Sequence, residues 1–266
     1  MSLTAFLTDS TLCIGCKACE VACKEWNGVE EDGLDWTGFS YDNTGALGAS
    51  TWRHVKFVEQ PPIPGLGGNA EQTSWTFSSD VCKHCEEAGC LEACPTGSIV
   101  RTEFGGVLIQ PDVCNGCGYC VTTCPFGVVE RNHKDGRAFK CTFCYDRQKA
   151  NLMPACAKVC PTESIQFGEI EELRTRADHR LEELHRRGIA DANVYDARES
   201  SVGGTHAMFI VRGDPRSYNL PPSPEVPTVY QRKAWTSSAI AAALFLCGTL
   251  AAFLADGRRE SRRSVR

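Results

Sequence analysis

The sequence predicts an α+β protein organised by repeated cysteine motifs and followed by one C-terminal transmembrane helix. Three observations support this prediction. Seventeen cysteines occur in 266 residues, and all but one fall into four groups of similar spacing. Short strand-like segments separate the groups, and a charged segment with helical periodicity follows them. Residues 234–255 then form a run without any charged side chain.

The composition excludes several classes of protein. Charged residues make up 23% of the chain and apolar residues 42%, as in a folded globular protein. The net charge of −5 argues against a nucleic-acid binder, because phosphate neutralisation requires a basic surface. The N-terminus has neither the basic nor the apolar region of a secretory signal, so we expect no cleaved signal and no disulfide-rich secreted scaffold.

The cysteine groups are internal repeats of one binding unit. Each group opens with C-x2-C and closes with C-x3-C, and proline follows the last three groups. The middle spacing is two residues in groups one and three, four in group two and eleven in group four. Group one is Cys13, Cys16, Cys19 and Cys23; group two is Cys82, Cys85, Cys90 and Cys94; group three is Cys114, Cys117, Cys120 and Cys124; group four is Cys141, Cys144, Cys156 and Cys160.

Short hairpins are expected between the groups, because apolar pairs flank glycine-containing turns. The insert at residues 26–80 is rich in glycine, aspartate and aromatic residues and is expected to hold loops plus one hairpin. The expected strand pairs are Ile99–Val100 with Val107–Ile109, Val128–Val129 with Ala138–Phe139, and Trp52–Val58 with Trp75–Phe77.

One longer helix is expected at Glu171–Arg187. Apolar residues recur at helical spacing from Leu173 to Leu184 among charges, and Gly188 ends the pattern. Ala207–Val211 reads as a single short strand.

The C-terminal segment favours a membrane span. Leu220–Pro227 is proline-rich and predicts a stiff extended linker. Residues 234–255 would form a helix of about 33 Å, enough for a hydrocarbon core of ~30 Å. A buried core helix is the alternative, but the run is followed by a basic tail at residues 256–266 rather than by further domain.

The cysteine spacing is typical of iron–sulfur ligation. Thiolates suit zinc, cuprous ions and iron–sulfur clusters. Structural zinc sites pair two C-x2-C motifs a dozen or more residues apart, which groups one and three do not resemble. C-x2-C-x2-C-x3-C is the bacterial ferredoxin run, in which three cysteines hold one cubane and the fourth serves its neighbour. Sixteen cysteines match four [4Fe–4S] clusters, although the spacing of group four leaves zinc open. Cys247 is most simply a small buried side chain.

Other candidate residues carry weaker signals. The six histidines are dispersed, and each is expected to be a surface or packing residue. No G-x-G-x-x-G follows a strand, so no dinucleotide site is supported. Lys83, Lys140 and Arg147 lie beside cysteines; each is either a solvated charge or a residue that tunes a cluster, since cluster potentials respond to nearby charge.

Residues 81–168 resemble the four-cluster iron–sulfur subunits that accompany molybdopterin oxidoreductases, above all the beta subunit of respiratory formate dehydrogenase. The segments that carry the resemblance are CKHCEEAGCLEACP, CNGCGYCVTTCPF, KCTFCYDR and VGGTHAMFIV, before a proline-rich stretch and a C-terminal apolar helix. Some relatives replace the second cysteine of group three and hold a [3Fe–4S] cluster, whereas this chain has Cys117 there, which points to four cubanes.

The resemblance implies two nested ferredoxin-like modules with long connecting loops within residues 1–170. The inner module, residues 80–130, contains groups two and three, and the outer module contains groups one and four; residues 171–219 form a helix–strand extension and residues 220–233 the linker. The implied ligand sets are Cys13, Cys16, Cys19 and Cys160; Cys141, Cys144, Cys156 and Cys23; Cys82, Cys85, Cys90 and Cys124; and Cys114, Cys117, Cys120 and Cys94.

The function implied by the resemblance is electron transfer without catalysis. A molybdopterin catalytic subunit (alpha) with molybdenum or tungsten would oxidise formate, and electrons would leave through four [4Fe–4S] clusters to a membrane subunit (gamma) with a cytochrome b haem or a quinone site. The same series of clusters would serve a polysulfide, nitrate or dimethyl sulfoxide reductase, or a hydrogenase. A zinc-binding interaction protein is a more distant alternative.

The expected location is the cell membrane, with a single span in the lipid bilayer. Five arginines follow the apolar run, against Arg232 and Lys233 before it, so the positive-inside rule leaves the C-terminus in the cytoplasm and the cluster domain outside. Export together with a partner that carries a twin-arginine signal, as the resemblance implies, reconciles this orientation with the missing signal peptide.

Overall fold

The computed structural model describes residues 2–31, 38, 42, 44–60 and 74–264. The chain divides into two units, Met1–Val226 and Pro227–Arg266. The first unit contains the four cysteine groups, and the second consists of a short turn and one long helix.

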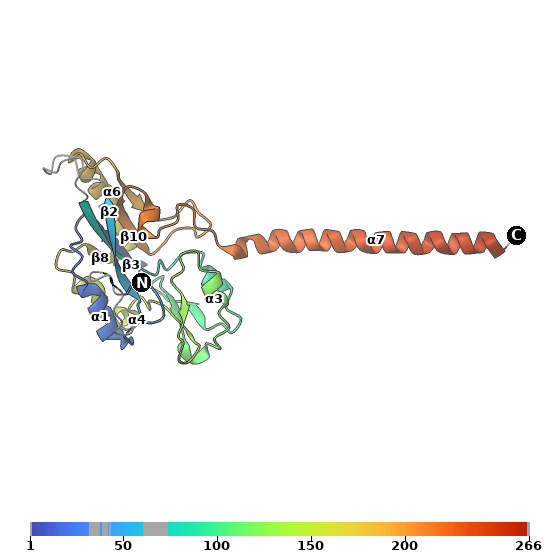
Figure 1. Ribbon diagram of the computed structural model, residues 1–266, viewed down its shortest axis with the longest axis horizontal. Coiled ribbons are helices and arrows are strands. Elements are labelled where there is room, and N and C mark those ends of the chain that lie inside the picture. Colours follow the sequence, from blue (N-terminus) through green and yellow to red (C-terminus); the bar gives the residue numbers. More distant parts are fainter. Residues whose placement is uncertain (1, 32–37, 39–41, 43, 61–73, 265–266) are drawn as a thin grey trace. The chain divides into compact units, whose positions relative to one another are not determined.

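A four-stranded sheet forms the frame of the first unit (Figure 1). Its strand order is β8 (Ile165–Glu169), β1 (Thr4–Asp9), β10 (Ala207–Arg212) and β9 (Ala192–Tyr195). β10 runs parallel to β1, and the other two pairs are antiparallel. The strand expected at residues 207–211 is confirmed, whereas the other three were not anticipated. The extension at residues 171–219 therefore completes the sheet that begins at the N-terminus.

The sheet separates two cores. Ala5 and Leu7 face the helix α6 (Ile170–Arg186), which buries Leu173 against them. Phe6 faces the opposite side, toward the cysteine-bearing loops, as the two-residue period of a strand requires. The predicted helix at residues 171–187 is confirmed to within one residue at each end.

A longer hairpin stands beside the sheet. β2 (Arg53–Gln60) pairs antiparallel with β3 (Ser74–Val81), so the hairpin expected within the insert is confirmed. β3 contacts β1 and β10, and β2 contacts the helix α1 (Ala18–Asn27). This hairpin therefore connects the sheet with the first cysteine group.

The two short hairpins differ in how well the sequence located them. β4 (Ile99–Arg101) pairs with β5 (Val107–Ile109) as expected. The partner of β7 (Ala138–Phe139) is β6 (Glu130–Arg131), so the strand predicted at residues 128–129 was wrong. Asn132 and Asp135 accept backbone N–H bonds two residues ahead, and these tight turns bring residue 131 opposite residue 138.

Short helices follow or contain the cysteines. They are α1, α2 (Gly89–Glu92), α3 (Tyr119–Thr122), α4 (Tyr145–Lys149) and α5 (Ala155–Lys158). α1 packs on α5, and α2 packs on α3. In Figure 1, α1 and α4 lie together while α3 lies apart from them. Groups one and four are thus neighbours in space, and so are groups two and three.

The segment expected as a linker is packed, not free, over most of its length. Leu220 and Val226 are buried, Tyr195 donates a hydrogen bond to Pro221 O at 2.7 Å, and Val226 N donates to Ser201 Oγ at 2.6 Å. The first unit therefore continues to Val226 before the chain leaves it.

The second unit contains α7 (Gln231–Ser264), which is longer than the predicted span at residues 234–255. An 18-residue stretch within residues 227–253 has a mean hydropathy of 1.7, so by length and composition this segment could cross a membrane. The helix continues into the basic residues that were expected to form a separate tail. Cys247 is exposed on this helix, so the expectation of a buried side chain was wrong.

Candidate metal centres

Cys13, Cys16, Cys19 and Cys160 line one cavity of the first unit. The first three come from the loop before and the first turn of α1, and Cys160 comes from the end of group four. Ser79 and Ser164 also line this cavity, and the Ser79 hydroxyl lies 3.2 Å from the Cys19 sulfur. The chain therefore returns its last grouped cysteine to the first group.

Cys94, Cys114, Cys117 and Cys120 line a second cavity of the same kind. Cys94 ends group two, and the other three open group three. Although partial burial opposes ionisation, hydroxyls of Ser98 and Thr96 lower the pKa of the Cys94 thiol to about 7. This cavity favours a thiolate at that position.

Cys23 lies among the thiols of group four. Burial raises the pKa of the Cys23 thiol, and repulsion from Cys141, Cys156 and Cys144 raises it further. Burial also raises the pKa of Cys144 to about 11, again with a contribution from Cys156. These four thiols therefore form another set.

The remaining set contains the first three cysteines of group two and the last of group three. Burial raises the pKa of the Cys85 thiol well above its ordinary value, and Cys82, Cys124 and Cys90 add repulsion. Burial raises the pKa of Cys90 to about 12, where Cys82 and Cys124 also contribute. Each of the four sets thus combines three cysteines of one group with the last cysteine of another.

The loops of group three owe their curvature to glycine. Gly116 and Gly118 have φ values of +72° and +80°, in the left-handed region. A Cβ at Gly116 would lie 2.6 Å from the carbonyl oxygen of Gly136. Position 116 between two cysteines therefore requires glycine, because the chain turns sharply there against a neighbouring backbone.

Backbone N–H groups point at sulfur atoms in two of the sets. Ala138 N donates to Cys114 Sγ at 3.5 Å, and Phe143 N donates to Cys141 Sγ at 3.3 Å. Such bonds stabilise negative charge on a ligand sulfur, which makes them one determinant of cluster potential.

The thiol sets fit iron–sulfur clusters better than single metal ions. Within the described part of the chain, no three His, Cys, Asp or Glu side chains converge closely enough to hold one ion. In two of the sets the thiols instead line a cavity, as ligands to the corners of a cubane must. Crowded buried thiols resist ionisation because each thiolate repels the others, and bound iron supplies the positive charge that offsets this repulsion.

The basic residues beside the cysteines are buried, so the interpretation of these residues as solvated charges was wrong. Lys83 is 1% exposed, with its ammonium bonded to Asp80 and to Val81 O at 2.9 Å. Lys140 is 3% exposed and donates to Val107 O and to Cys141 O at 3.2 Å.

Lys140 lies between two thiol sets. Burial alone would lower the pKa of Lys140, but Cys82, Cys90 and Cys141 around it raise that pKa above its ordinary value. Arg147 is also buried; its Nε donates to Met153 O at 2.7 Å and its guanidinium lies 4.1 Å from the Trp26 ring.

The histidines occupy packing and surface positions. His84 is 1% exposed, and its Nδ1 accepts a hydrogen bond from Val107 N at 3.0 Å. His54 is also buried, with Nδ1 2.8 Å from the Thr44 hydroxyl, and His133 is exposed. The expectation of surface or packing roles agrees with these positions.

One residue that the sequence did not indicate contacts a thiol set. Arg53 begins β2 and donates from Nη2 to Cys156 Sγ at 3.3 Å. Its position in a strand more than twenty residues from the nearest grouped cysteine gave no signal; only the fold brings it to the sulfur atoms.

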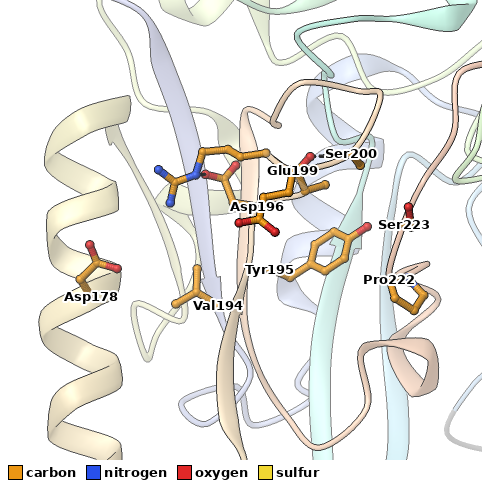
Figure 2. Close-up of a pocket in the computed structure, with 10 residues that line it drawn as sticks. Asp178, Val194, Tyr195, Asp196, Glu199, Ser200, Pro222 and Ser223 are labelled. Atoms are coloured by element: carbon orange, nitrogen blue, oxygen red, sulfur yellow. Dashed lines mark hydrogen bonds and ion pairs between the residues drawn. The ribbon is translucent and has the colours of Figure 1, made fainter. Parts of the chain in front are cut away.

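A separate surface cavity of about 490 Å³ lies away from the cysteines. Figure 2 shows it between Asp178 of α6 and the segment around Tyr195, Asp196 and Glu199. Asp196 is already paired with Arg174 at 3.3 Å and Arg198 at 2.8 Å. The carboxylate is thus engaged within the fold, and we assign the cavity no role.

Comparison with known proteins agrees with this geometry. Two family profiles, each described as a 4Fe-4S dicluster domain, match residues 73–170 and 12–98. The class is therefore an iron–sulfur protein with two ferredoxin-like dicluster regions.

Individual relatives narrow the class to a family. The formate dehydrogenase-O iron-sulfur subunit of Escherichia coli is 41% identical over 84% of this chain and 72% of the relative. The formate dehydrogenase iron-sulfur subunit of Haemophilus influenzae is 41% identical over 84% and 70%. The thiosulfate reductase electron transfer subunit of Salmonella typhi is 38% identical over 74% and 86%. The chain belongs to the family of formate dehydrogenase iron–sulfur subunits, the electron-transfer subunits of formate dehydrogenase-type complexes.

Proposed function

We propose that this chain relays electrons through four [4Fe–4S] clusters between a molybdopterin subunit that oxidises formate and a membrane subunit with a haem or quinone site. The observation that carries the proposal is the gathering of sixteen thiols into four sets of four. When bound, such clusters supply one-electron redox chemistry.

The proposed ligands follow the four sets. Each set takes the first three cysteines of its own group and the last cysteine of a partner group, so groups one and four form an outer module and groups two and three an inner module. The sets are Cys13, Cys16, Cys19 and Cys160; Cys141, Cys144, Cys156 and Cys23; Cys82, Cys85, Cys90 and Cys124; and Cys114, Cys117, Cys120 and Cys94.

Electrostatic interactions between the sets support a linear order. Arg53 interacts with both Cys19 and Cys156, which joins the first set to the second. Repulsion from Cys82 raises the pKa of Cys141, after burial and Cys144, which joins the second set to the third. Cys120 acts likewise on Cys90, which joins the third set to the fourth.

The two ends of this order reach the surface. Cys16 in the first set and Cys117 in the fourth are exposed, unlike the other grouped cysteines. Exposed apolar side chains accompany the outer module, among them Ile14, Val21 and Trp26. An apolar surface beside an accessible cluster suits a partner that exchanges electrons with it.

The route of the chain supports a polarity for the relay. Val226, the last residue of the first unit, packs beside Gly89, where an added Cβ would lie 2.9 Å from its side chain. The chain therefore leaves for the proposed membrane helix next to the inner module. We assign the inner end to the membrane subunit and the outer end to the catalytic subunit.

The helix α7 serves as the membrane anchor in this proposal. The five arginines after the apolar run favour a cytoplasmic C-terminus and a cluster unit outside. In this proposal the partner carries out catalysis. This chain sets the distances between its clusters and their reduction potentials. Because the chain is also similar to a thiosulfate reductase subunit, thiosulfate is a second candidate substrate for that partner.

Isolation of the native complex under anaerobic conditions tests the proposal. We expect a brown protein, bleached by dithionite, with about sixteen iron atoms and as many labile sulfides per chain. The largest co-purifying subunit should contain a molybdopterin and reduce the clusters with formate. Clusters that formate does not reduce, but that thiosulfate reoxidises after chemical reduction, would change the substrate. A colourless zinc protein would overturn the relay.

A further inference from the structure

Arg53 is a buried cation that lacks an acidic partner. It is 1% exposed, and among the described residues no carboxylate lies within ion-pair distance of its guanidinium. Its Nε is buried with no hydrogen-bond partner in the same part of the chain. Since a guanidinium remains charged at any physiological pH and burying an unpaired charge is costly, Arg53 requires negative charge nearby.

The neighbours of the guanidinium are sulfur atoms of two different sets. Nη2 donates to Cys156 Sγ at 3.3 Å, in the second set. Nη1 donates to Ser79 O at 3.0 Å and to Ser79 Oγ at 3.4 Å. Ser79 Oγ in turn lies 3.2 Å from Cys19 Sγ, in the first set. When Cys19 is a thiolate ligand, the hydroxyl donates to it.

One aromatic ring holds the guanidinium in this position. The Cζ atom of Arg53 lies 4.8 Å from the centre of the Phe6 ring. Phe6 itself packs on Phe143 at 5.1 Å and Phe167 at 5.3 Å. The arginine is therefore fixed between the two sets by the central strand β1, without support from an acid.

We propose that Arg53 is a positioning residue that raises the reduction potentials of the two outer-module clusters, acting directly on the Cys156 set and through Ser79 on the Cys19 set. This inference rests on the proposed function. A cluster with four thiolates is negatively charged and becomes more negative on reduction. A fixed cation and hydrogen bonds to sulfur stabilise the reduced form, and low exposure strengthens both effects.

A redox titration of the anaerobically purified complex, followed by electron paramagnetic resonance, tests this role. Arg53→Met should lower two of the four midpoint potentials, and the altered waves should be those that Cys16→Ser and Cys144→Ser identify as the outer-module clusters. Ser79→Ala should lower the first of these potentials alone, because it removes only the link to Cys19. Arg53→Lys keeps the positive charge, so its midpoint potentials should lie between those of the wild type and those of Arg53→Met.

Arg212→Met is the matched control. Arg212 is also a buried arginine, 3% exposed, but its Nη2 pairs with Asp191 at 3.0 Å. Its removal should leave all four potentials unchanged. If Arg53→Met does not load iron, Ser79→Ala decides the question by the same readout.

The possible results separate this inference from the proposed function. Four clusters with unchanged potentials in both Arg53→Met and Ser79→Ala would overturn the role of Arg53 and leave the relay intact. A wild-type complex without clusters would overturn the relay itself, and with it this inference.

Discussion

Cys23 and Cys160 exchange places between the two outer cysteine groups. Cys160 ends group four in the sequence but lines the cavity of group one. Cys23 ends group one but lies among Cys141, Cys144 and Cys156. The packing of α1 on α5 makes this exchange possible, because each helix contains or precedes one of the two cysteines.

The exchange predicts which cluster changes when one of these two cysteines is substituted. Cys23→Ser should perturb the cluster held by Cys141, Cys144 and Cys156, because it removes that set's fourth thiol. Electron paramagnetic resonance of the reduced complex measures the effect. Cys160→Ser is the reciprocal variant and should alter the other outer cluster. If Cys23→Ser affects only the cluster of Cys13, Cys16 and Cys19, the crossed assignment is wrong.

A second prediction concerns the exposed end of the inner module. Cys117→Ser should convert one cubane to a [3Fe–4S] cluster, because the weaker ligand lets its iron dissociate into solvent. The oxidised protein should then show a new paramagnetic signal while three clusters remain. Cys247→Ser on α7 is the control and should change nothing. An unaltered spectrum in Cys117→Ser would exclude Cys117 as a ligand.

Lys140 gives a prediction for the junction between the modules. Its ammonium is buried among Cys82, Cys90 and Cys141, so Lys140→Met should lower the potentials of the second and third clusters. A potentiometric titration measures both. Lys134→Met removes an exposed lysine and should have no effect on them. Equal potentials in wild type and Lys140→Met would show that the charge does not tune either cluster.

The tight loop at Gly116 predicts that a side chain at this position destabilises the protein locally. Gly116→Ala combines a positive φ with a clash against Gly136 O, whereas Gly127→Ala has φ +62° and open space around its Cβ. Gly127→Ala should cost about 1 kcal/mol from backbone strain alone. Gly116→Ala should cost more and lower the iron content at the fourth set. Thermal unfolding and iron analysis measure both variants, and equal behaviour would disprove the close approach.

The orientation of α7 is tested in cells. A reporter that is active only in the cytoplasm, fused after Arg266, should work, because the arginines after the apolar run retain that flank inside. Protease added to spheroplasts should digest the cluster unit. Protection of that unit in the assembled complex would reverse the orientation and place formate oxidation on the cytoplasmic side.

Much of the site was predictable from the sequence because the relevant information is local. Three thiols within a short loop can reach one cluster whatever surrounds them, so the C-x2-C spacing predicted iron–sulfur ligands. The periodic segment at residues 171–187 predicted α6, and the uncharged run predicted an apolar helix. The hairpin at Val128–Val129 was misplaced by two residues, because side-chain bonds of Asn132 and Asp135 decide the turn.

Features that depend on contacts between residues far apart in the sequence were decided only by the tertiary structure. β1, which was not anticipated from the sequence, is an inner strand because β8 and β10 pair on either side of it. The sequence left Lys140 open as either a solvated charge or a tuning residue, and only the fold shows that it is 3% exposed. Arg53 reaches Cys156 across 103 residues of sequence. Cysteine spacing predicted iron–sulfur chemistry for this chain, whereas the environment that sets each cluster's potential arises only when the fold brings these charges together.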